Sequence, residues 1–214
     1  MGKLLRRRGL MAEAHPAPLP EWDYEWSSSS GSAPTGWTKT TSGTTTTKVA
    51  SGYWQIIVST QNGYVQYAWP DTYSKGVIQV SFRFNSNYGN LRVYLSNGTN
   101  AIGVRATYSN SSGGKKALLL NDASTVANMT TVGSFTKAKT YNLRLELDSG
   151  YADVYWRNYS DGEDWQLVAS HVDITTTTNS SPLNMTTLRF TSAASNGTNS
   201  TWYLYNIKMK FGRT

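Results

Sequence analysis

The sequence contains no cysteine, so disulfide bridges, zinc–thiolate sites and thiol nucleophiles are excluded. Long apolar runs are missing as well. No stretch approaches the roughly 20 apolar residues that a bilayer-spanning helix needs. The basic start of the chain lacks the apolar core of a signal peptide, because Arg6, Arg7 and Arg8 interrupt it. We therefore predict neither a membrane span nor a secretion signal.

Charged side chains are scarce. They make up 15% of the chain, against about 25% in ordinary globular domains. Lys3 and the three following arginines supply much of the net charge of +7. The rest of the chain shows no stripe of Lys or Arg interleaved with aromatic residues, which a nucleic-acid-binding face would need. We predict that the folded domain does not bind nucleic acid. The abundant Ser, Thr, Asn and Gly are typical of virion-surface, secreted or sugar-facing β proteins.

Aromatic residues, by contrast, make up 13% of the chain and offset a low apolar share of 38%, because each buries about 150–250 Å². Apolar and polar residues alternate in short segments spaced by about 8–12 residues, which predicts an all-β sandwich or barrel. The predicted strands are 53–59, 64–69, 76–84, 91–95, 102–108, 116–121, 141–148, 151–157, 165–170, 187–191 and 202–211. Residues 121–132 hold one short helical turn at most. We predict an antiparallel, two-sheet jelly-roll sandwich.

Two of these strands show which residues face the core. The strand over 141–148 places Tyr141, Leu143, Leu145 and Leu147 on its apolar side and Asn142, Arg144, Glu146 and Asp148 on its solvent side. The last strand places Tyr203, Tyr205, Ile207, Met209 and Phe211 on one face, opposite Trp202, Leu204, Asn206, Lys208 and Lys210.

The first 36 residues are predicted to form an extended arm and linker, and residues 37–214 the sandwich. Prolines over 16–20 favour an extended chain without ladder hydrogen bonds. One interpretation is a disordered end. The other is an arm that docks on a partner protein, with its leucines in an apolar groove and its arginines against acidic groups. Its docking residues would be Leu4, Leu5, Arg6, Arg7, Arg8, Trp22 and Trp26.

The strand Leu-Arg-Leu-Glu-Leu-Asp over 143–148 and the closing Tyr-Asn-Ile-Lys over 205–208 resemble the concanavalin A-like lectin/glucanase sandwich in its laminin-G-like branch. The segments 1–8, 21–26, 36–43 and 207–213 are similar to small structural proteins of phages and prophages of gut Firmicutes. This second resemblance implies a virion component, assembled in the host cytoplasm and exposed extracellularly. It also implies contacts with other virion proteins through the arm, and multiple copies or a homo-oligomer.

Candidates for chemistry are few. Glucanases of the resembled fold carry a Glu-x-Asp-x-x-Glu-type motif, and the nearest match, Glu146-Leu-Asp148, has Tyr151 where the second Glu would stand. Glu146 beside Arg144 has the pattern of an ordinary solvent face. His171 and Asp173 share a strand face, but no nucleophile on a sharp turn accompanies them, so they read as polar edge residues. We predict no catalytic residue, no cofactor and no enzyme activity.

One loop carries three carboxylates, Asp161, Glu163 and Asp164. Their oxygens suit a calcium ion, which takes 6–8 oxygen ligands, although their spacing differs from an EF-hand loop. The other interpretation is a plain hairpin turn at Asp-Gly, with Trp165 packing as the next strand begins.

Sugar binding needs flat aromatic faces beside amide, carboxylate or guanidinium groups. The segment that follows the strand over 76–84 combines them, and its candidate residues are Asn85, Asn87, Tyr88, Asn90, Arg92 and Tyr94. The alternative is an Asn/Gly turn without a ligand.

Three functions follow, in order of preference. The first is a virion structural protein, a head, tail or fibre decoration that also adheres to glycans on a host cell or mucus. The second is a free carbohydrate-binding module or lectin. The third is a β-glucanase-type hydrolase, which the missing carboxylate disfavours.

Overall fold

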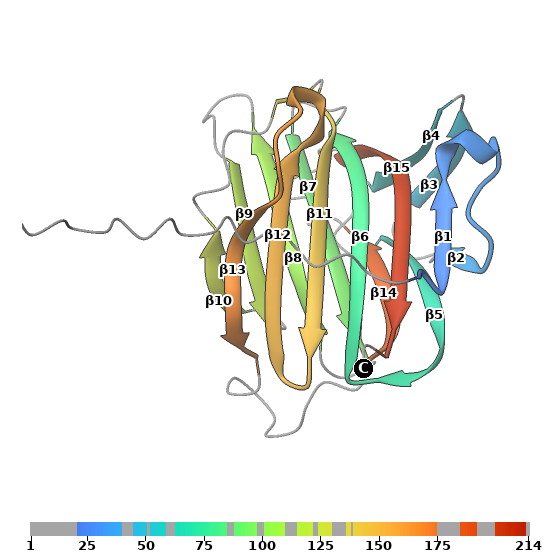
Figure 1. Ribbon diagram of the computed structural model, residues 1–214. Coiled ribbons are helices and arrows are strands. Elements are labelled where there is room, and N and C mark those ends of the chain that lie inside the picture. The colour runs from blue at the N-terminus through green and yellow to red at the C-terminus, as the bar shows by residue number, and fades with distance from the viewer. Residues whose placement is uncertain are drawn as a thin grey trace, which may run out of the picture.

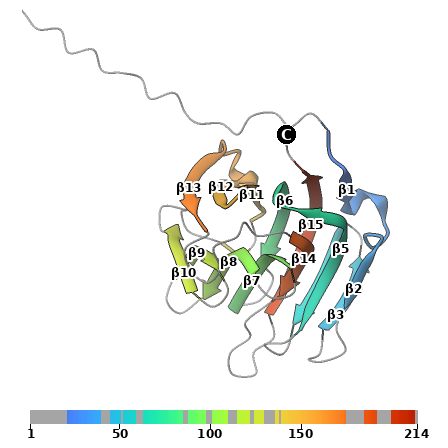
Figure 2. The same ribbon diagram turned by 90° about the horizontal axis from the view of Figure 1, so that it is seen from below.

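The computed structural model describes residues 21–39, 45–50, 52–58, 63–84, 88–97, 101–109, 115–121, 124–129, 136–137, 139–174, 185–191 and 200–212. Its strands form two antiparallel sheets that lie face to face (Figures 1 and 2). This architecture confirms the predicted all-β, jelly-roll sandwich. Within the described residues, no helix has the length and apolar character that crossing a bilayer would take.

The first sheet, called sheet A, has eight strands. Its order is β13 (Gln166–Asp173), β12 (Tyr151–Asn158), β11 (Tyr141–Asp148), β6 (Lys75–Phe84), β15 (Ser200–Phe211), β4 (Tyr53–Val58) and β3 (Thr45–Ala50). The eighth, β1 (Tyr24–Ser27), pairs with β15 beyond the point where β4 ends. Sheet A faces the viewer in Figure 1, with β1 at its right edge.

The second sheet, called sheet B, has seven strands and lies behind sheet A in the same view. Its order is β10 (Ser124–Met129), β9 (Lys115–Asn121), β8 (Ala101–Ser109), β7 (Tyr88–Ser96), β14 (Met185–Thr191), β5 (Tyr64–Tyr73) and β2 (Trp37–Lys39). Every strand predicted from the sequence is present, with its ends shifted by a few residues at most.

The core lies between the sheets and is rich in aromatic rings. Trp202, Phe82, Phe84 and Phe190 are fully buried, and Trp37 stacks on Phe190 with ring centroids 5.0 Å apart. Burying one such side chain stabilises the fold by about 1.5–3 kcal/mol. The aromatic residues therefore supply the core that the low apolar share would otherwise leave thin.

The predicted facing of the last strand is wrong in part, because β15 contains a bulge. The register with β6 shifts between Leu204 and Asn206, which makes Tyr205 an extra residue. One extra residue reverses the alternation. Trp202 and Leu204 point inward before the bulge, and Ile207 and Met209 point inward after it.

Two further expectations are corrected. Residues 124–129, placed in a segment with at most a helical turn, form the edge strand β10. The last part of the predicted arm also belongs to the sandwich: β1 pairs with β15, and a 3-10 turn (Ser28–Ser30) follows it. The domain therefore includes residues 24–36, because the aromatic side chains of β1 pack against the core.

The side of β11 predicted to face solvent is buried except at its end. Asn142, Arg144 and Glu146 are buried, and Asp148 is exposed as predicted. The Arg144 guanidinium lies 2.7 Å from the Glu146 carboxylate. With its amide oriented to suit its neighbours, Asn142 accepts from Arg157 at 2.9 Å and donates to the Ser81 hydroxyl at 2.8 Å. Long polar side chains thus cover one another in the middle of a wide sheet, where single-strand periodicity predicts exposure.

Candidate functional site

The hairpin between β11 and β12 sets the geometry of a pocket on the outer face of sheet A. Its two turn residues, Ser149 and Gly150, both have positive φ, 50° and 105°, as tight hairpins with right-handed strand twist require. The Ser149 amide donates to the Ser74 carbonyl at 3.1 Å, which ties the turn to the start of β6. This turn places Asp148 opposite Tyr151 and Glu146 opposite Asp153.

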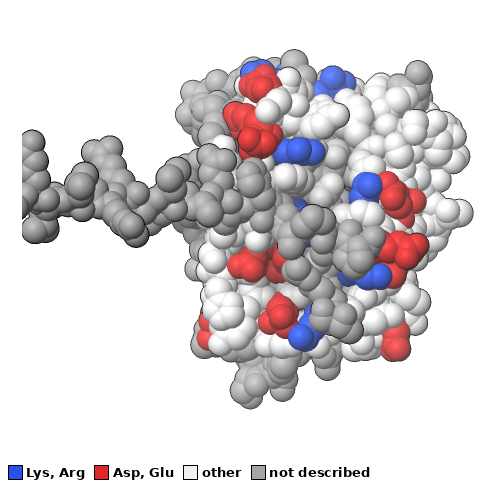
Figure 3. Space-filling model, viewed as in Figure 1, with Lys and Arg blue, Asp and Glu red and all other residues white. Residues whose placement is uncertain are grey.

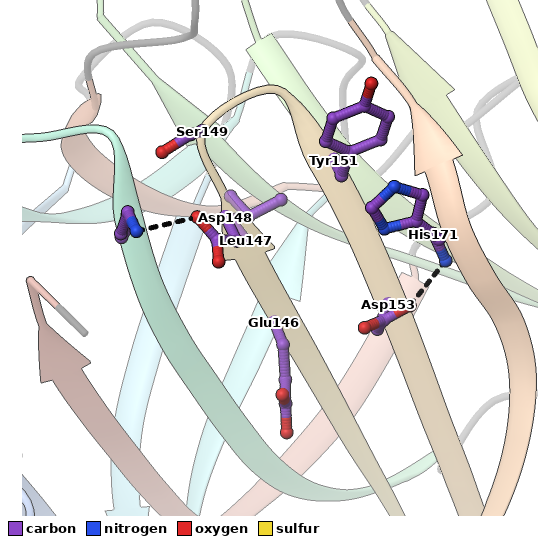
Figure 4. Close-up of a pocket in the computed structure, with 8 residues that line it drawn as sticks. Glu146, Leu147, Asp148, Ser149, Tyr151, Asp153 and His171 are labelled. Atoms are coloured by element: carbon purple, nitrogen blue, oxygen red, sulfur yellow. Dashed lines mark hydrogen bonds and ion pairs between the residues drawn. The ribbon is translucent and has the colours of Figure 1, made fainter. Parts of the chain in front are cut away.

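The pocket has a volume of about 420 Å³. Its lining residues come from three adjacent strands and the turn: Lys75, Glu146, Leu147, Asp148, Ser149, Tyr151, Asp153 and His171. Figure 4 shows the rings of Tyr151 and His171 lying against one another, with Asp153 next to His171. Aromatic and acidic groups therefore meet at one place on the surface.

An irregular backbone in β13 brings His171 to this place. The pairing of β13 with β12 shifts register between Ala152 and Val154, and His171 has a φ of 47°, which is uncommon for a residue with a side chain. Its backbone amide donates to the Asp153 carboxylate at 2.5 Å. Its ring stacks on Tyr151 with centroids 3.9 Å apart and planes 10° apart.

Each carboxylate of the pocket has a cation or a backbone amide next to it. Lys75 lies 3.0 Å from Asp148, Arg144 lies 2.7 Å from Glu146, and the His171 amide serves Asp153. Figure 3 shows blue and red atoms lying next to one another at several places on this face. The pocket can therefore accept hydrogen bonds from hydroxyl groups beside a flat ring.

Four of the carbohydrate-binding residues predicted from the sequence lie on the other sheet. Asn85 and Asn87 fall outside the described residues. Tyr88 and Asn90 belong to β7, but their side chains also fall outside the described part. Arg92 and Tyr94 lie half-buried on the outer face of sheet B. Their role in sugar binding stays a prediction.

Sequence reasoning missed the pocket on sheet A. From the sequence, Glu146 is expected on a solvent face and His171 at a strand edge, and neither is expected to line a pocket. A signal was present in the two-residue Ser-Gly turn, because it fixes which residues of the flanking strands stand opposite one another. The turn alone pairs Glu146 with Asp153. The kink at His171 has no counterpart in the sequence pattern.

The calcium candidates lie in a capped turn. Asp161 ends a 3-10 turn (Tyr159–Asp161), pairs with Lys139 and accepts from the Asn158 amide group at 2.7 Å. Glu163 accepts from the backbone amide of Asn158 at 3.2 Å, and Asp164 is exposed. Among the residues that the structure describes, no group of three or more His, Cys, Asp or Glu is placed to hold a metal ion.

The predicted docking residues divide into two groups. Leu4, Leu5, Arg6, Arg7 and Arg8 lie outside the described residues. Trp22 is half-buried, with Lys208 5.8 Å from its ring. Trp26 is 7% exposed and donates to the Ser32 carbonyl at 3.0 Å. Its ring packs on Trp54 in the core. Trp26 is thus a core residue of the sandwich, and the docking role predicted for it is corrected.

No protein-family model and no curated protein sequence matches the chain. Solved structures share its fold at low identity. The GH43 protein BlXynB (mutant K247S) from Bacillus licheniformis matches with a TM-score of 0.60 and 11% identity, over 91% of this chain and 40% of that one. The carbohydrate-binding module CBM66 from Bacillus subtilis matches with 0.55 and 14%, over 82% and 96%. The metal-free lectin I-B4 from Griffonia simplicifolia matches with 0.58 and 8%, over 87% and 98%.

These likenesses show that the fold is a concanavalin A-like β-sandwich, as the resemblance of 143–148 and 205–208 predicted. The chain spans 40% of the GH43 protein and nearly the whole of the module and the lectin.

Proposed function

We propose that this protein is a carbohydrate-binding module that holds a neutral sugar in the pocket at the β11–β12 hairpin. The stacked Tyr151–His171 pair beside three carboxylates carries the proposal. Tyr151 is 40% exposed, so an apolar ring is available at the surface. A ring presents a flat apolar face to the C–H side of a sugar, while carboxylates accept hydrogen bonds from its hydroxyls.

The charge of the pocket favours a neutral ligand. Glu146, Asp148 and Asp153 outnumber the lining cation, Lys75. An acidic sugar would meet like charges there, and like charges placed together cost free energy. The names of two fold neighbours, a carbohydrate-binding module and a lectin, support the same class of ligand.

Binding alone accounts for the site. Hydrolysis by a glucanase of this fold would need a second glutamate, and Tyr151 stands at that position. The GH43 neighbour does not bear on this, because the chain spans 40% of it. Release of reducing sugar from xylan or β-glucan by the purified protein would contradict a purely binding role.

The virion role stays a prediction from the two chain ends, together with its partner proteins, its multiple copies and its extracellular display. Adhesion to host or mucus glycans is the part of that prediction which the pocket supports.

The test is calorimetric titration of the full chain with neutral oligosaccharides cut from xylan, β-glucan, mannan, fructan and galactan. We expect one class to bind, and Tyr151→Ala to weaken that binding about tenfold or more, because stacking and apolar contact are lost. Asp153→Asn keeps an oxygen that accepts from the His171 amide and removes the carboxylate charge. Any change in its sugar affinity therefore reports a lost ligand contact and not a change in the fold around His171.

The matched control is Tyr159→Ala. Tyr159 is 59% exposed and does not line the pocket, so its loss should leave the affinity unchanged. Equal affinities for wild type and Tyr151→Ala, or no binding of any neutral oligosaccharide, would refute the proposal.

A further inference from the structure

The strands of sheet B carry many more cations than anions. Their basic residues are Lys39, Arg92, Arg105, Lys115, Lys116 and Arg189, and their single acid is Asp71. Three of the cations, Arg92, Arg105 and Arg189, come from the neighbouring strands β7, β8 and β14. Alternation places them all on the outer face, because Val93, Val104 and Phe190 beside them are buried in the core.

Arg92 and Arg105 stand directly opposite one another across β7 and β8. Like charges in this position repel and destabilise a sheet. Burial and then the neighbouring charge of Arg92 lower the pKa of Arg105. Among the described residues no carboxylate pairs with either arginine, and the buried Nε atoms of both have no hydrogen-bond partner there.

Arg189 lies diagonally across from Arg92, since β14 and β7 pair Arg189 with Tyr94. Its guanidinium donates to the Gln66 side chain at 3.0 Å and lies 4.0 Å from the centre of the Tyr64 ring. These two contacts hold the charge in place without neutralising it. A preorganised guanidinium loses little freedom when it binds an anion.

Tyr94 shares the outer face of β7 with Arg92 and stands opposite Arg189 on β14. A Cβ atom at Gly103, the residue opposite, would lie 2.3 Å from Tyr94 Cδ1 and 2.2 Å from the Val93 carbonyl. Only glycine therefore leaves room for the Tyr94 ring beside the backbone of β8. Among the side chains that the structure describes, this face carries three guanidinium groups with the Tyr64 and Tyr94 rings beside them.

We propose that this outer face of sheet B is a second binding site, which takes an anionic polysaccharide through its carboxylate or sulfate groups. Guanidinium groups bind such oxyanions through paired hydrogen bonds. An anion between Arg92 and Arg105 removes their repulsion, so binding adds the relief of that repulsion to the new hydrogen bonds. The site is separate from the pocket on sheet A and does not depend on it.

Single-stranded nucleic acid is the other polyanion to consider. It uses aromatic rings that project and stack on bases. Of the rings described on this face, Tyr64 lies against Arg189 and Tyr94 lies against the Gly103 backbone. Both are half-buried and do not project from the sheet, which favours the polysaccharide.

The test measures binding of the full chain to immobilised heparin, which carries sulfates, and to polygalacturonate, which carries carboxylates. Neutral dextran and a single-stranded oligonucleotide are run beside them. We expect at least one anionic polysaccharide to bind, with an affinity that falls as salt is added. Removing one charge-assisted contact should weaken binding about tenfold. The double variant Arg92→Gln/Arg105→Gln should therefore lose about 100-fold.

The charge-matched control is Lys137→Gln/Lys139→Gln, which removes the same net charge outside sheet B and should leave binding unchanged. Tyr151→Ala should also leave it unchanged, so this site and the sheet A pocket are tested separately. Melting temperatures show whether each variant is folded. Three outcomes would overturn the proposal: equal affinities for the double variant and the wild type, no binding to either polysaccharide, or tighter binding of the oligonucleotide than of both.

Discussion

The two outer faces of the sandwich treat charge in opposite ways. On sheet A, cations and acids lie in pairs: Lys75 with Asp148, Arg144 with Glu146, Lys208 with Glu25 and Lys210 with Asp23. On sheet B, Arg92 and Arg105 face one another with no acid of the described residues beside them. Most charges of the first face are compensated in pairs, whereas the second face gathers positive charge that no acid of the described residues compensates.

This difference distinguishes charges that are paired within the protein from charges that can still pair with a ligand. A cation on sheet A that lies beside a carboxylate has its charge compensated within the protein. An unpaired arginine on sheet B lowers the stability of the fold and keeps its hydrogen bonds for a ligand. Binding sites often contain groups that destabilise the fold slightly, and the bound ligand relieves this destabilisation. Net charge alone, +7 for the chain, does not show which face carries it.

The largest effect is expected from breaking a pair on sheet A. Glu146→Leu leaves the guanidinium of Arg144, only 6% exposed in its side chain, without its carboxylate. An uncompensated buried charge typically costs about 3–5 kcal/mol. We expect Glu146→Leu to lower the free energy of unfolding by about 3 kcal/mol, measured by urea denaturation.

The control is the double variant Arg144→Leu/Glu146→Leu. Replacing both members of a buried pair by apolar groups is often nearly neutral, so it should recover most of the loss. If the single and double variants were equally unstable, the pair would not be the reason for the burial of these side chains.

A smaller effect of opposite sign is expected on sheet B. Arg92→Gln removes one of two like charges, and we expect it to raise the free energy of unfolding by up to about 1 kcal/mol. Arg189→Gln is the matched comparison. It loses the Gln66 hydrogen bond and the Tyr64 ring contact, so it should destabilise the protein. Thermal denaturation at low salt compares the two variants. A loss of stability in both would show that sheet B holds no unrelieved repulsion.

Sequence alone could predict most of this fold but only part of its surface. The alternation over 141–148 and 76–84 is enough to identify strands and their core sides, because it reports local burial. The bulge at Tyr205 is a single added residue that leaves the composition of the strand unchanged. Strand β10 was missed because Ser124–Met129 has too little alternation to stand out.

The two sites depend on which strands are neighbours. The sheet A pocket follows in part from the hairpin turn, which is local, and in part from His171, whose positive φ is not visible in the sequence. The arginine face needs the order β8-β7-β14, in which β14 comes from a distant part of the chain. Arg92 was proposed from its own strand, but Arg105 and Arg189 join it only in the folded sheet. No single strand carries a basic stripe, and the arginines gather only across strands.

The smallest effect tests whether acid affects sheet A through its pairs. Asp23 accepts from Lys210 at 2.8 Å and from the Phe211 amide at 2.6 Å. Burial alone would raise the pKa of Asp23, but these hydrogen bonds and the Lys210 charge outweigh it and lower the pKa from its ordinary 3.8. A pKa lowered by folding contributes stability that is present above the unfolded value and lost as pH falls through the folded value. Wild type should therefore melt at a slightly higher temperature than Asp23→Asn at about pH 6, and this advantage should vanish near about pH 2. Since other carboxylates titrate in both proteins, the difference between them isolates Asp23. An advantage that persisted unchanged in acid would mean that the charge of the Asp23 carboxylate does not help to hold β1 on β15.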